Sequence, residues 1–372
     1  MILSKHIDVN GRNKLKKLIN ILFQQLLGLL SFFYGLIIEL RNRAYDKRKL
    51  KIVCFPVKVI SIGNLSVGGT GKTPMAAFII NALLKKGYKV AYLSRGYKRK
   101  TRGFQLFTHG KTKVESIGDE AYQIAMQFPH ICVAVCEKRV EGVRRILACS
   151  PVDYIVLDDA FQHRQIGRNL DIVMIDATCS PLLDSLLPKG RLREPIKSLK
   201  RAQVVCINKC MNWEQGKYLK AALRTKGYLL DNTLVFLCYY RIKDTLNSLS
   251  PILNSLSVSE ALRYEAFVIS ALANNIAFSQ FLENNGIRVV HTMFYEDHHF
   301  YTILDIQKII VIYKKLKALK KEIIILTTEK DATKLRPFFI QNSDFQDLPI
   351  FVVGIELAFY ENLNVFEQVL DL

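Results

Sequence analysis

Several kinds of pattern are missing from this sequence of 372 residues, and each absence excludes a class of protein. The eight cysteines form no C-x-x-C pair, and no histidine stands at zinc-finger spacing, so neither a disulfide framework nor a zinc site is expected. We expect the thiols to be buried as small hydrophobic groups in a reducing compartment. Hydrophobic residues make up 50% of the chain and charged ones 23%, which excludes extended disorder.

Acidic residues are scarce relative to basic ones. The chain has 33 Asp and Glu against 53 Lys and Arg, a formal charge of +20. Such an excess favours anionic partners, namely nucleic acid, a phospholipid surface or a phosphorylated substrate. No helix-turn-helix, RNP-type or zinc signature accompanies the charge, so we expect no nucleic-acid partner.

Residues 18–38 contain no charged side chain and are long enough to cross a bilayer as a helix. Basic residues stand on both sides of this segment, which suits anionic headgroups, and the larger group follows it. If the helix spans, the rest of the chain lies in the cytoplasm. A helix that lies in the interface or packs on its own protein is also open, because small and polar residues recur at steps of three and four: Asn20, Gln24, Gly28, Ser31 and Gly35.

Short runs rich in Val and Ile alternate with helical stretches along the rest of the chain. This alternation predicts an α/β protein with a doubly wound, mainly parallel sheet. The rhythm breaks around residues 230–250, where we expect the crossing into a second, smaller α/β domain. The expected strands are residues 57–62, 89–93, 131–135, 154–158, 171–176 and 203–207, followed by 265–270, 288–294, 322–327 and 349–353.

A glycine-rich loop, GNLSVGGTGKT, follows the first expected strand and precedes a helical run. Its glycines let backbone N–H groups turn toward phosphate oxygens, Lys72 can reach the β- and γ-phosphates, and the Thr73 hydroxyl can bind Mg²⁺. Ser66 stands where the common pattern has its first glycine. The loop nevertheless predicts a P-loop site for a nucleoside triphosphate, formed by Gly68, Gly69, Thr70, Gly71, Lys72 and Thr73.

Carboxylates stand at two further places where phosphoryl-transfer chemistry needs them. Asp158 and Asp159 end an apolar strand, as carboxylates that hold a nucleotide's metal commonly do, and Gln162 and His163 follow within reach of phosphate or metal-bound water. Asp119 and Glu120 open an expected helix. They are either capping residues or, for Asp119, a general base for an acceptor hydroxyl. The segment Glu296-Asp297-His298-His299 offers partners for such a base.

Seven segments together resemble one family, the tetraacyldisaccharide 4′-kinases of lipid A synthesis. They are GNLSVGGTGKTP from Gly63, SRGYK from Ser94, GDEA from Gly118, LDDAFQHR from Leu157, LLPKGRLREP from Leu186, EDHHF from Glu296 and TTEKDATKL from Thr327. The resemblance implies transfer of the γ-phosphate of ATP, with Mg²⁺, to the 4′-hydroxyl of an acylated disaccharide 1-phosphate. It also implies a location at the cytoplasmic face of the bacterial inner membrane.

The resemblance assigns roles to individual residues. Asp119 matches the catalytic base and His298 its partner, with His299 as the alternative, and Glu120 and Lys72 belong to the same active site. The sequence departs from the family at one position and in one segment: Ala160 replaces a glycine, and residues 270–275 match poorly. The remaining matches are Asp158 and Asp159 for metal and phosphate, Gln162 and His163 beside them, and Arg193 and Glu194 in the L-R-E-P loop.

The expected organisation is therefore a membrane-associated helix in residues 1–40, a P-loop kinase domain in 41–235, and a second domain in 236–372 that closes the active-site cleft. We expect a monomer. Arg95 belongs to a basic loop that is either a contact for acceptor phosphates or a solvated charge run. Lys330 and Asp331 follow a strand like the base-reading K-x-D of other NTPases, which raises an adenine contact as a hypothesis.

Two other functions fit parts of the sequence. Partitioning ATPases also combine a G-G-x-G-K-T loop with a membrane segment, but their loop has a lysine before the glycine pair, where Val67 stands here. A nucleic-acid-binding NTPase is favoured by the charge alone.

Overall fold

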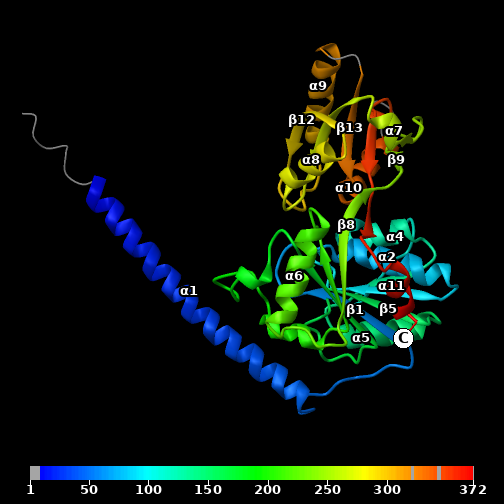
Figure 1. Ribbon diagram of the computed structural model, residues 1–372. Coiled ribbons are helices and arrows are strands. Elements are labelled where there is room, and N and C mark those ends of the chain that lie inside the picture. Colours follow the sequence, from blue (N-terminus) through cyan, green and yellow to red (C-terminus); the bar gives the residue numbers. More distant parts are fainter. Residues whose placement is uncertain (1–8, 320–321, 342–344, 372) are drawn as a thin grey trace, which may run out of the picture.

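The computed structural model describes residues 9–319, 322–341 and 345–371, which form two β-sheets and a long N-terminal helix (Figure 1). We call the part built on the larger sheet the first lobe and the part built on the smaller sheet the second lobe. The two lobes are stacked one above the other, and the N-terminal helix leaves the first lobe at an angle (Figure 1).

The larger sheet has nine strands among the described residues, in the order β15-β8-β7-β6-β1-β5-β2-β4-β3. Its central strands are parallel and buried on both faces, which is why the sequence presents them as continuous Val, Ile and Leu runs. The strands are β1 (Lys58–Asn64), β2 (Val90–Ser94), β3 (Gln105–Leu106), β4 (Cys132–Val135), β5 (Tyr154–Asp158), β6 (Leu170–Asp176), β7 (Val204–Asn208), β8 (Leu234–Ile242) and β15 (Ile355–Phe359).

Helices cover both faces of this sheet, so the expected doubly wound arrangement is confirmed. Helices α2, α4 and α11 pack on one face, and α5 and α6 pack on the other. The helices of this lobe are α2 (Lys72–Lys85), α3 (Val114–Ile117), α4 (Asp119–Gln127), α5 (Arg139–Cys149), α6 (Trp213–Thr225) and α11 (Leu363–Val369), with 3₁₀ turns η1 (Pro181–Leu183) and η2 (Ile196–Arg201).

The second lobe is also an α/β layer structure, as expected. Its sheet has the order β10-β9-β14-β13-β11-β12 among the described residues, and β11, β12, β13 and β14 run parallel. Apolar clusters fill both faces of this sheet. The elements are β9 (Thr245–Ser248), β10 (Leu256–Ser257), α7 (Val258–Ala261), β11 (Glu265–Ser270), α8 (Asn275–Asn284), β12 (Arg288–Phe294), α9 (Ile303–Leu319), β13 (Ile323–Thr328), α10 (Glu329–Gln341) and β14 (Ile350–Val353).

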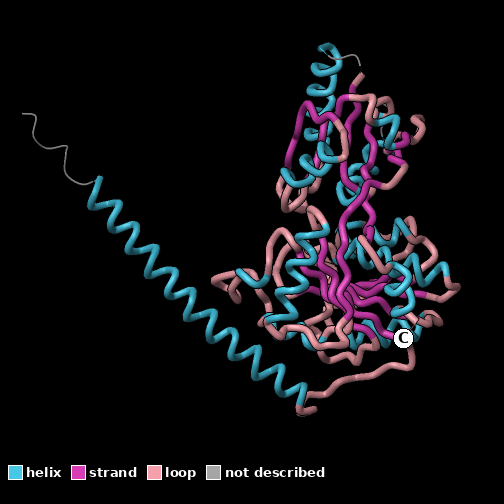
Figure 2. Tube along the Cα trace, viewed as in Figure 1, coloured by secondary structure: helices cyan, strands magenta, loops and turns pink. Residues whose placement is uncertain are grey.

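The predicted boundary at residue 236 does not match the sheets. Strand β8 belongs to the first lobe, and the chain returns to that lobe at its C-terminal end, where β15 pairs antiparallel with β8. Phe366 of α11 is fully buried there, against Phe78 and Phe236. The two passages between the lobes run side by side, with Lys243 N–H donating to the Gly354 carbonyl at 2.9 Å (Figure 2). We propose that the second domain comprises residues 243–354.

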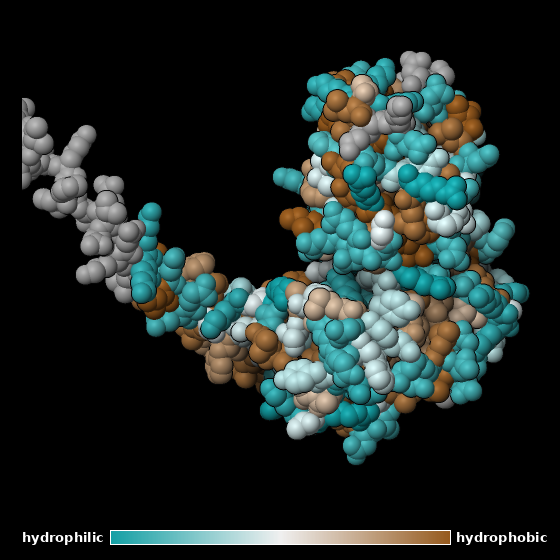
Figure 3. Space-filling model, turned by 45° about the horizontal axis from the view of Figure 1, so that its top comes forward, coloured by the Kyte–Doolittle hydropathy of each residue, from teal (hydrophilic) through white to brown (hydrophobic). Residues whose placement is uncertain are grey.

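The N-terminal helix α1 (Val9–Asp46) is apolar and largely exposed. Residues 19–46 are long and apolar enough to cross a membrane by length and composition, and only 6% of the most apolar window is buried. Hydrophobic side chains lie along the part of the helix in view in Figure 3. The exposed large ones include Leu22, Leu26, Leu29, Phe33 and Leu36, the face opposite the small and polar stripe.

The later part of the small and polar stripe packs on the first lobe, whereas Asn20 and Gln24 are exposed. Ser31 Oγ donates to the Leu186 carbonyl at 2.9 Å and accepts from Lys189 N–H at 3.0 Å. A side chain at Gly35 would come within 2.7 Å of Leu186, so glycine allows the close approach. Packing on the chain itself, one of the arrangements left open by the sequence, therefore accounts for Ser31 and Gly35, while the opposite face stays exposed.

Candidate functional site

The glycine-rich loop lies at the carboxyl end of β1 and leads into the N-terminus of α2, where an open α/β sheet places its ligand. Gly71 has φ +96°, and a side chain there would collide with Asn208 and Tyr240. Nothing lies within 4 Å of the position that a Cβ would take at Gly68 or Gly69. The loop backbone is thus open to a ligand while its end is held tightly.

The N-terminus of α2 fits a phosphate group. Its N-cap residue, Gly71, offers no side chain to the first amides of the helix. Unpaired amides at a helix start carry partial positive charge and bind anions. Lys72 and Thr73 are the first two residues of this helix, so an ammonium and a hydroxyl stand beside the free amides.

Asp159 is held between two cations next to the loop. Arg193 makes a bidentate pair with its carboxylate, at 2.7 and 3.0 Å, and Lys72 Nζ lies 3.5 Å from Oδ1. Burial would raise the pKa of Asp159, but the Arg193 hydrogen bonds and the Lys72 charge hold it well below its usual range. Arg193 also donates to the side chain of Asn64, so one guanidinium joins the end of β1 to the end of β5.

The pKa values of two neighbouring carboxylates, Asp158 and Glu120, are shifted in the opposite direction. Asp158 is 1% exposed, accepts from the Tyr92 hydroxyl at 2.7 Å and from Asp159 N–H at 2.8 Å, and burial raises its pKa. Burial, helped by the negative charge of Asp158, raises the pKa of Glu120 to about 7. The charge of Lys72 lowers this pKa and that of Asp119 raises it, so Glu120 feels both the phosphate loop and Asp119.

The oxygen ligands in this region suit Mg²⁺ when phosphates complete its shell. Within the described ranges, no three or more His, Cys, Asp or Glu side chains are grouped to hold a metal ion alone. Mg²⁺ is commonly held by one or two carboxylates together with waters and substrate phosphates. The expected ligands Thr73, Asp158 and Asp159 all stand at strand ends or helix starts around the loop. Their chemistry therefore fits a metal that arrives with a nucleotide.

Asp119 is one of the points at which the second lobe contacts the first. It is 4% exposed at the start of α4, and one imidazole and two ammonium groups of the second lobe surround its Oδ2 atom. His298 Nδ1 lies at 2.8 Å, Lys334 Nζ at 3.2 Å and Lys330 Nζ at 3.6 Å. Burial would raise the pKa of Asp119, but the hydrogen bond from His298 and the two ammonium groups hold it well below its usual range.

Of the two candidate histidines, the structure brings His298 to Asp119. His299 pairs with Asp305 at 3.1 Å and stacks on Tyr295 with ring centroids 4.5 Å apart, both within the second lobe. His298 has φ +67°, a left-handed backbone conformation that turns its side chain away from that of its neighbour.

Gln162 and His163 lie beside the loop as expected. Gln162 Nε2 donates to the backbone carbonyl of Asn64 at 2.8 Å, and the backbone carbonyl of Gln162 accepts from Arg41 of α1 at 2.6 Å. Burial, together with the positive charges of nearby arginines, lowers the pKa of His163 to about 4, so this imidazole is neutral near pH 7. Arg95 is exposed directly after β2, at the same edge of the sheet.

The adjacent residues Arg193 and Glu194 contact different parts of the structure. Arg193 faces Asp159, whereas Glu194 is fully buried and accepts from Arg201 at 2.8 Å and from Asn42 of α1 at 3.3 Å. The Tyr34 hydroxyl of α1 also donates to the Arg193 carbonyl, at 2.8 Å. Glu194 therefore fastens the N-terminal helix to the loop that carries Arg193.

Sequence reasoning missed the side chains that donate hydrogen bonds to the backbone carbonyls of the phosphate loop. Asn208 Nδ2, at the end of β7, donates to the Thr70 carbonyl at 3.2 Å, and Lys209 Nζ donates to the Gly69 carbonyl at 2.5 Å while pairing with Asp176 at 2.6 Å. Polar residues directly after an apolar strand were the available signal.

The motif T-E-K-D also has a different place from the one hypothesised. Asp331 is fully buried and accepts from the Thr328 hydroxyl at 2.7 Å and from Ala271 N–H at 3.1 Å. Lys330 pairs with Asp297 at 2.7 Å and faces Asp119. The motif thus organises the second lobe and its contact with the first, and the adenine-contact hypothesis gains no support from it.

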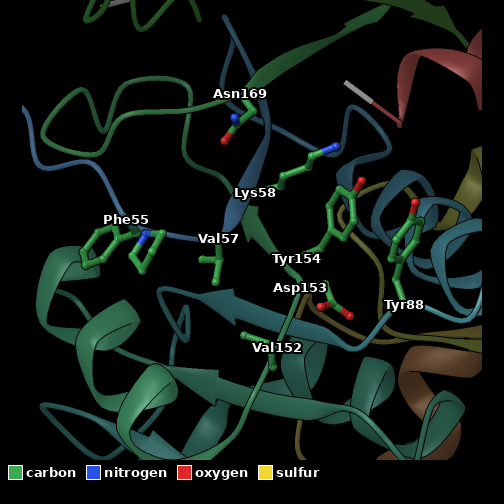
Figure 4. A pocket seen from close by; sticks show the side chains of 9 residues that line it. Phe55, Val57, Lys58, Tyr88, Val152, Asp153, Tyr154 and Asn169 are labelled. Carbon is green, nitrogen blue, oxygen red and sulfur yellow. The ribbon is translucent and has the colours of Figure 1, made fainter.

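A separate hollow of about 410 Å³ lies at the opposite edge of the larger sheet (Figure 4). Lys58 and Tyr154, which line it, begin β1 and β5, so the hollow stands at the amino ends of the strands. Ligands of open α/β sheets bind at the carboxyl ends. We therefore assign the functional site to the loop region and not to this hollow.

The fold and the site define the protein as a P-loop phosphotransferase. A model of the tetraacyldisaccharide-1-phosphate 4′-kinase family matches residues 23–372. The chain belongs to this family. Membership makes it a kinase with a hydroxyl acceptor, confirms the resemblance carried by the motifs, and favours the kinase over a partitioning ATPase.

Individual relatives agree with the family model. The tetraacyldisaccharide 4′-kinase of Parabacteroides distasonis is 38% identical over 322 residues, covering 84% of this chain and 85% of that protein. The enzyme of Chlorobium limicola is 34% identical over 344 residues, covering 91% and 94%. The crystal structure of LpxK from Aquifex aeolicus in complex with ATP matches with a TM-score of 0.72 and 29% identity, covering 94% of this chain and 98% of that one.

The raised pKa of Glu120 predicts a pH dependence of stability. Because this pKa rises from 4.5 to about 7 on folding, the native state binds more protons between these pH values, and stability falls as pH rises through them, by at most about 3 kcal/mol. Glu120→Gln is uncharged at every pH and loses this fall. Urea unfolding at pH 5 and pH 8 should show the variant gaining stability relative to wild type at the higher pH.

The exposed Glu283→Gln substitution on α8 is the control and should differ from wild type equally at both pH values. A Glu120→Gln difference that is the same at pH 5 and pH 8 would contradict the shifted pKa.

Proposed function

We propose that this protein transfers the γ-phosphate of ATP, with Mg²⁺, to the 4′-hydroxyl of a tetraacyldisaccharide 1-phosphate in lipid A synthesis. The observation that carries the proposal is the meeting of a phosphate loop and a buried, ionised carboxylate, Asp119, in a member of the 4′-kinase family. Glu120, which is influenced by both Lys72 and Asp119, links the two parts of the site.

On the nucleotide side, the loop amides from Gly68 to Lys72 would bind the phosphates, with the Lys72 ammonium against the β- and γ-phosphates. Thr73, Asp158 and Asp159 would hold Mg²⁺, which offsets charge on the phosphates when bound. Arg193 keeps Asp159 ionised and oriented through its bidentate pair. Such positioning and charge compensation are the main contributions that proteins make to phosphoryl transfer.

On the acceptor side, Asp119 would take the proton of the 4′-hydroxyl as the phosphoryl group moves. Its low pKa makes it a weak base, but it is ionised at every working pH. A loose transition state requires little proton transfer early in the reaction, so a weak base in the right position suffices. His298 orients this carboxylate through its 2.8 Å contact.

The remaining predicted residues would support the two sides. Gln162 braces the end of β1 through the Asn64 carbonyl, and the neutral His163 stands in the same turn without adding charge. Arg95, exposed at the carboxyl edge of the sheet, is available to an anionic acceptor. Glu194 would act indirectly, by holding α1 against the Arg193 loop.

Helix α1 would seat the protein on the cytoplasmic face of the inner membrane. A lipid acceptor has to be reached at a bilayer, and the exposed apolar face of α1 offers a surface for one. The basic residues that follow the helix suit anionic headgroups. The docking of α1 on the loop of Arg193 would bring that surface close to the active site.

Label transfer from γ-labelled ATP tests the kinase. Purified protein in detergent with Mg²⁺ and the acylated disaccharide 1-phosphate should label the lipid. Lys72→Ala should lower the rate about 10³-fold, because the phosphate charge loses its cation, and Asp119→Ala about 10²-fold. Lys85→Ala, exposed on the same helix α2, should transfer at the wild-type rate. Label found only in inorganic phosphate would point to an ATPase instead.

Cell fractionation tests the membrane proposal. Deleting residues 1–40 should move the protein from the membrane to the soluble fraction, because the exposed apolar face is lost. The matched control is Ser31→Ala in the full chain, which removes a contact between α1 and the first lobe but keeps the apolar face, and should stay with the membrane. An unchanged distribution of the truncated chain would contradict an anchor in α1.

A further inference from the structure

Lys334 is a buried cation whose charge the proposed reaction has not used. It lies on α10, and its side chain is 3% exposed. Among the described residues, it forms an ion pair with Asp119, at 3.2 Å, and its ammonium also lies 5.3 Å from the centre of the Phe300 ring. A buried ammonium is costly unless negative charge compensates it, and Asp119 and Asp331 supply that charge here.

Lys330, one turn earlier on α10, differs from Lys334 in its partners. Its ammonium is shared, lying 2.7 Å from Asp297 and 3.6 Å from Asp119. Asp297 also approaches His298, with its Oδ2 atom 3.4 Å from Nε2. Lys330 is therefore shared between carboxylates of both lobes, whereas the ion pair of Lys334 crosses the lobe boundary.

The frame that holds Lys334 in place also crosses this boundary. Gln123 of α4 donates to Glu329 of α10 at 3.0 Å, and Glu329 pairs with Lys243, at the passage between the lobes, at 2.6 Å. Helices α4 and α10 are thus aligned by a second polar contact, four residues from Asp119 on one helix and five from Lys334 on the other.

The two oxygens of Asp119 have different surroundings. Oδ2 is taken by His298, Lys334 and Lys330. Oδ1 accepts the N–H of Glu120 at 3.2 Å, and Glu120 is the other titratable group that faces it. Fixing Oδ2 from the second lobe leaves Oδ1 as the oxygen that can receive a proton from the side of the phosphate loop.

We propose that Lys334 is a positioning residue for the kinase: its ammonium fixes Oδ2 of Asp119 so that Oδ1 faces the acceptor hydroxyl. This inference rests on the proposed function, in which Asp119 is the base. Lys334 touches neither nucleotide nor acceptor and acts only through the carboxylate that it holds. A misplaced base costs turnover more than binding, because positioning matters most in the transition state.

The test compares steady-state transfer rates of Lys334→Met, Lys334→Arg and Asp119→Asn variants with wild type. Lys334→Met removes the charge and keeps the length of the chain, and should lower kcat about 10- to 100-fold while the KM for ATP stays within about threefold. Lys334→Arg restores a cation and should recover most of the lost rate. Arg336→Met, an exposed position on the same helix, is the control and should be unchanged.

A double-mutant cycle separates positioning from a structural role. In the Asp119→Asn background there is no carboxylate to position, so adding Lys334→Met should cause no further loss of kcat. If Lys334 merely supported the fold, the same substitution would lower the rate equally in both backgrounds. The double variant lacks both buried charges, and it therefore also serves if Lys334→Met alone does not fold, with thermal unfolding followed for every variant.

The outcomes distinguish this inference from the proposed function. Near-wild-type transfer by Asp119→Asn would overturn the base itself. A large loss in Asp119→Asn with an unchanged rate in Lys334→Met would overturn only the role of Lys334. A further tenfold loss in the double variant relative to Asp119→Asn would do the same.

Discussion

The contact of Asp119 with the second lobe is the interaction on which the arrangement of the site depends. A carboxylate that is 4% exposed costs several kcal/mol to bury unless cations compensate it. Here the two ammonium groups within 4 Å, and the imidazole of His298 beside them, belong to the other lobe. The charge of Asp119 therefore favours one placement of the lobes, and the proposed base has all its partners only in that placement.

Charge compensation also determines which carboxylates near the phosphate loop are ionised. Asp159 stays ionised because Arg193 and Lys72 compensate it, while burial favours the protonated form of Asp158 and Glu120. The pKa values of adjacent carboxylates in one site are thereby shifted in opposite directions, as is common in active sites. A bound metal cation would favour the charged form of Asp158 and Glu120.

Helix α1 belongs to this network as well as to the surface. Its Tyr34 and Asn42 contact the Arg193-Glu194 pair, and Arg41 contacts Gln162. The residues that hold Asp159 and brace the phosphate loop are therefore the residues that hold the helix. The exposed apolar helix and the phosphate loop are therefore joined through one loop, that of Arg193 and Glu194.

Local patterns predicted much of this. The Val and Ile runs predicted the parallel strands, because strands buried on both faces are rich in apolar β-branched residues, and the G-G-T-G-K-T loop predicted the phosphate site. Long-range pairing was beyond such patterns. The return of β15 to β8 joins residues more than a hundred positions apart, so the boundary at 236 was misplaced. Likewise, spacing offered two adjacent histidines, and only the left-handed backbone at His298 selects between them.

In the site, too, local motifs revealed some residues and left their long-range partners undetected. Lys72, Asp119, Asp158 and Asp159 carried recognisable motifs, but the partners of each one came from other elements. In the sequence, Lys330 belongs to a hypothesised base-reading motif and Lys334 to an ordinary helical run. No local pattern shows that both lysines face a carboxylate of the other lobe. The task of Glu194 was equally hidden, since its partners lie on α1 and η2.

The most direct test of an active site assembled from two lobes compares His298→Gln with His299→Gln in the transfer of labelled phosphate to the acylated disaccharide. The two residues are adjacent, and only His298 reaches Asp119. The account predicts a loss of about 100-fold in kcat for His298→Gln and a change of no more than about threefold for His299→Gln. Equal losses, or the larger loss in His299→Gln, would contradict it.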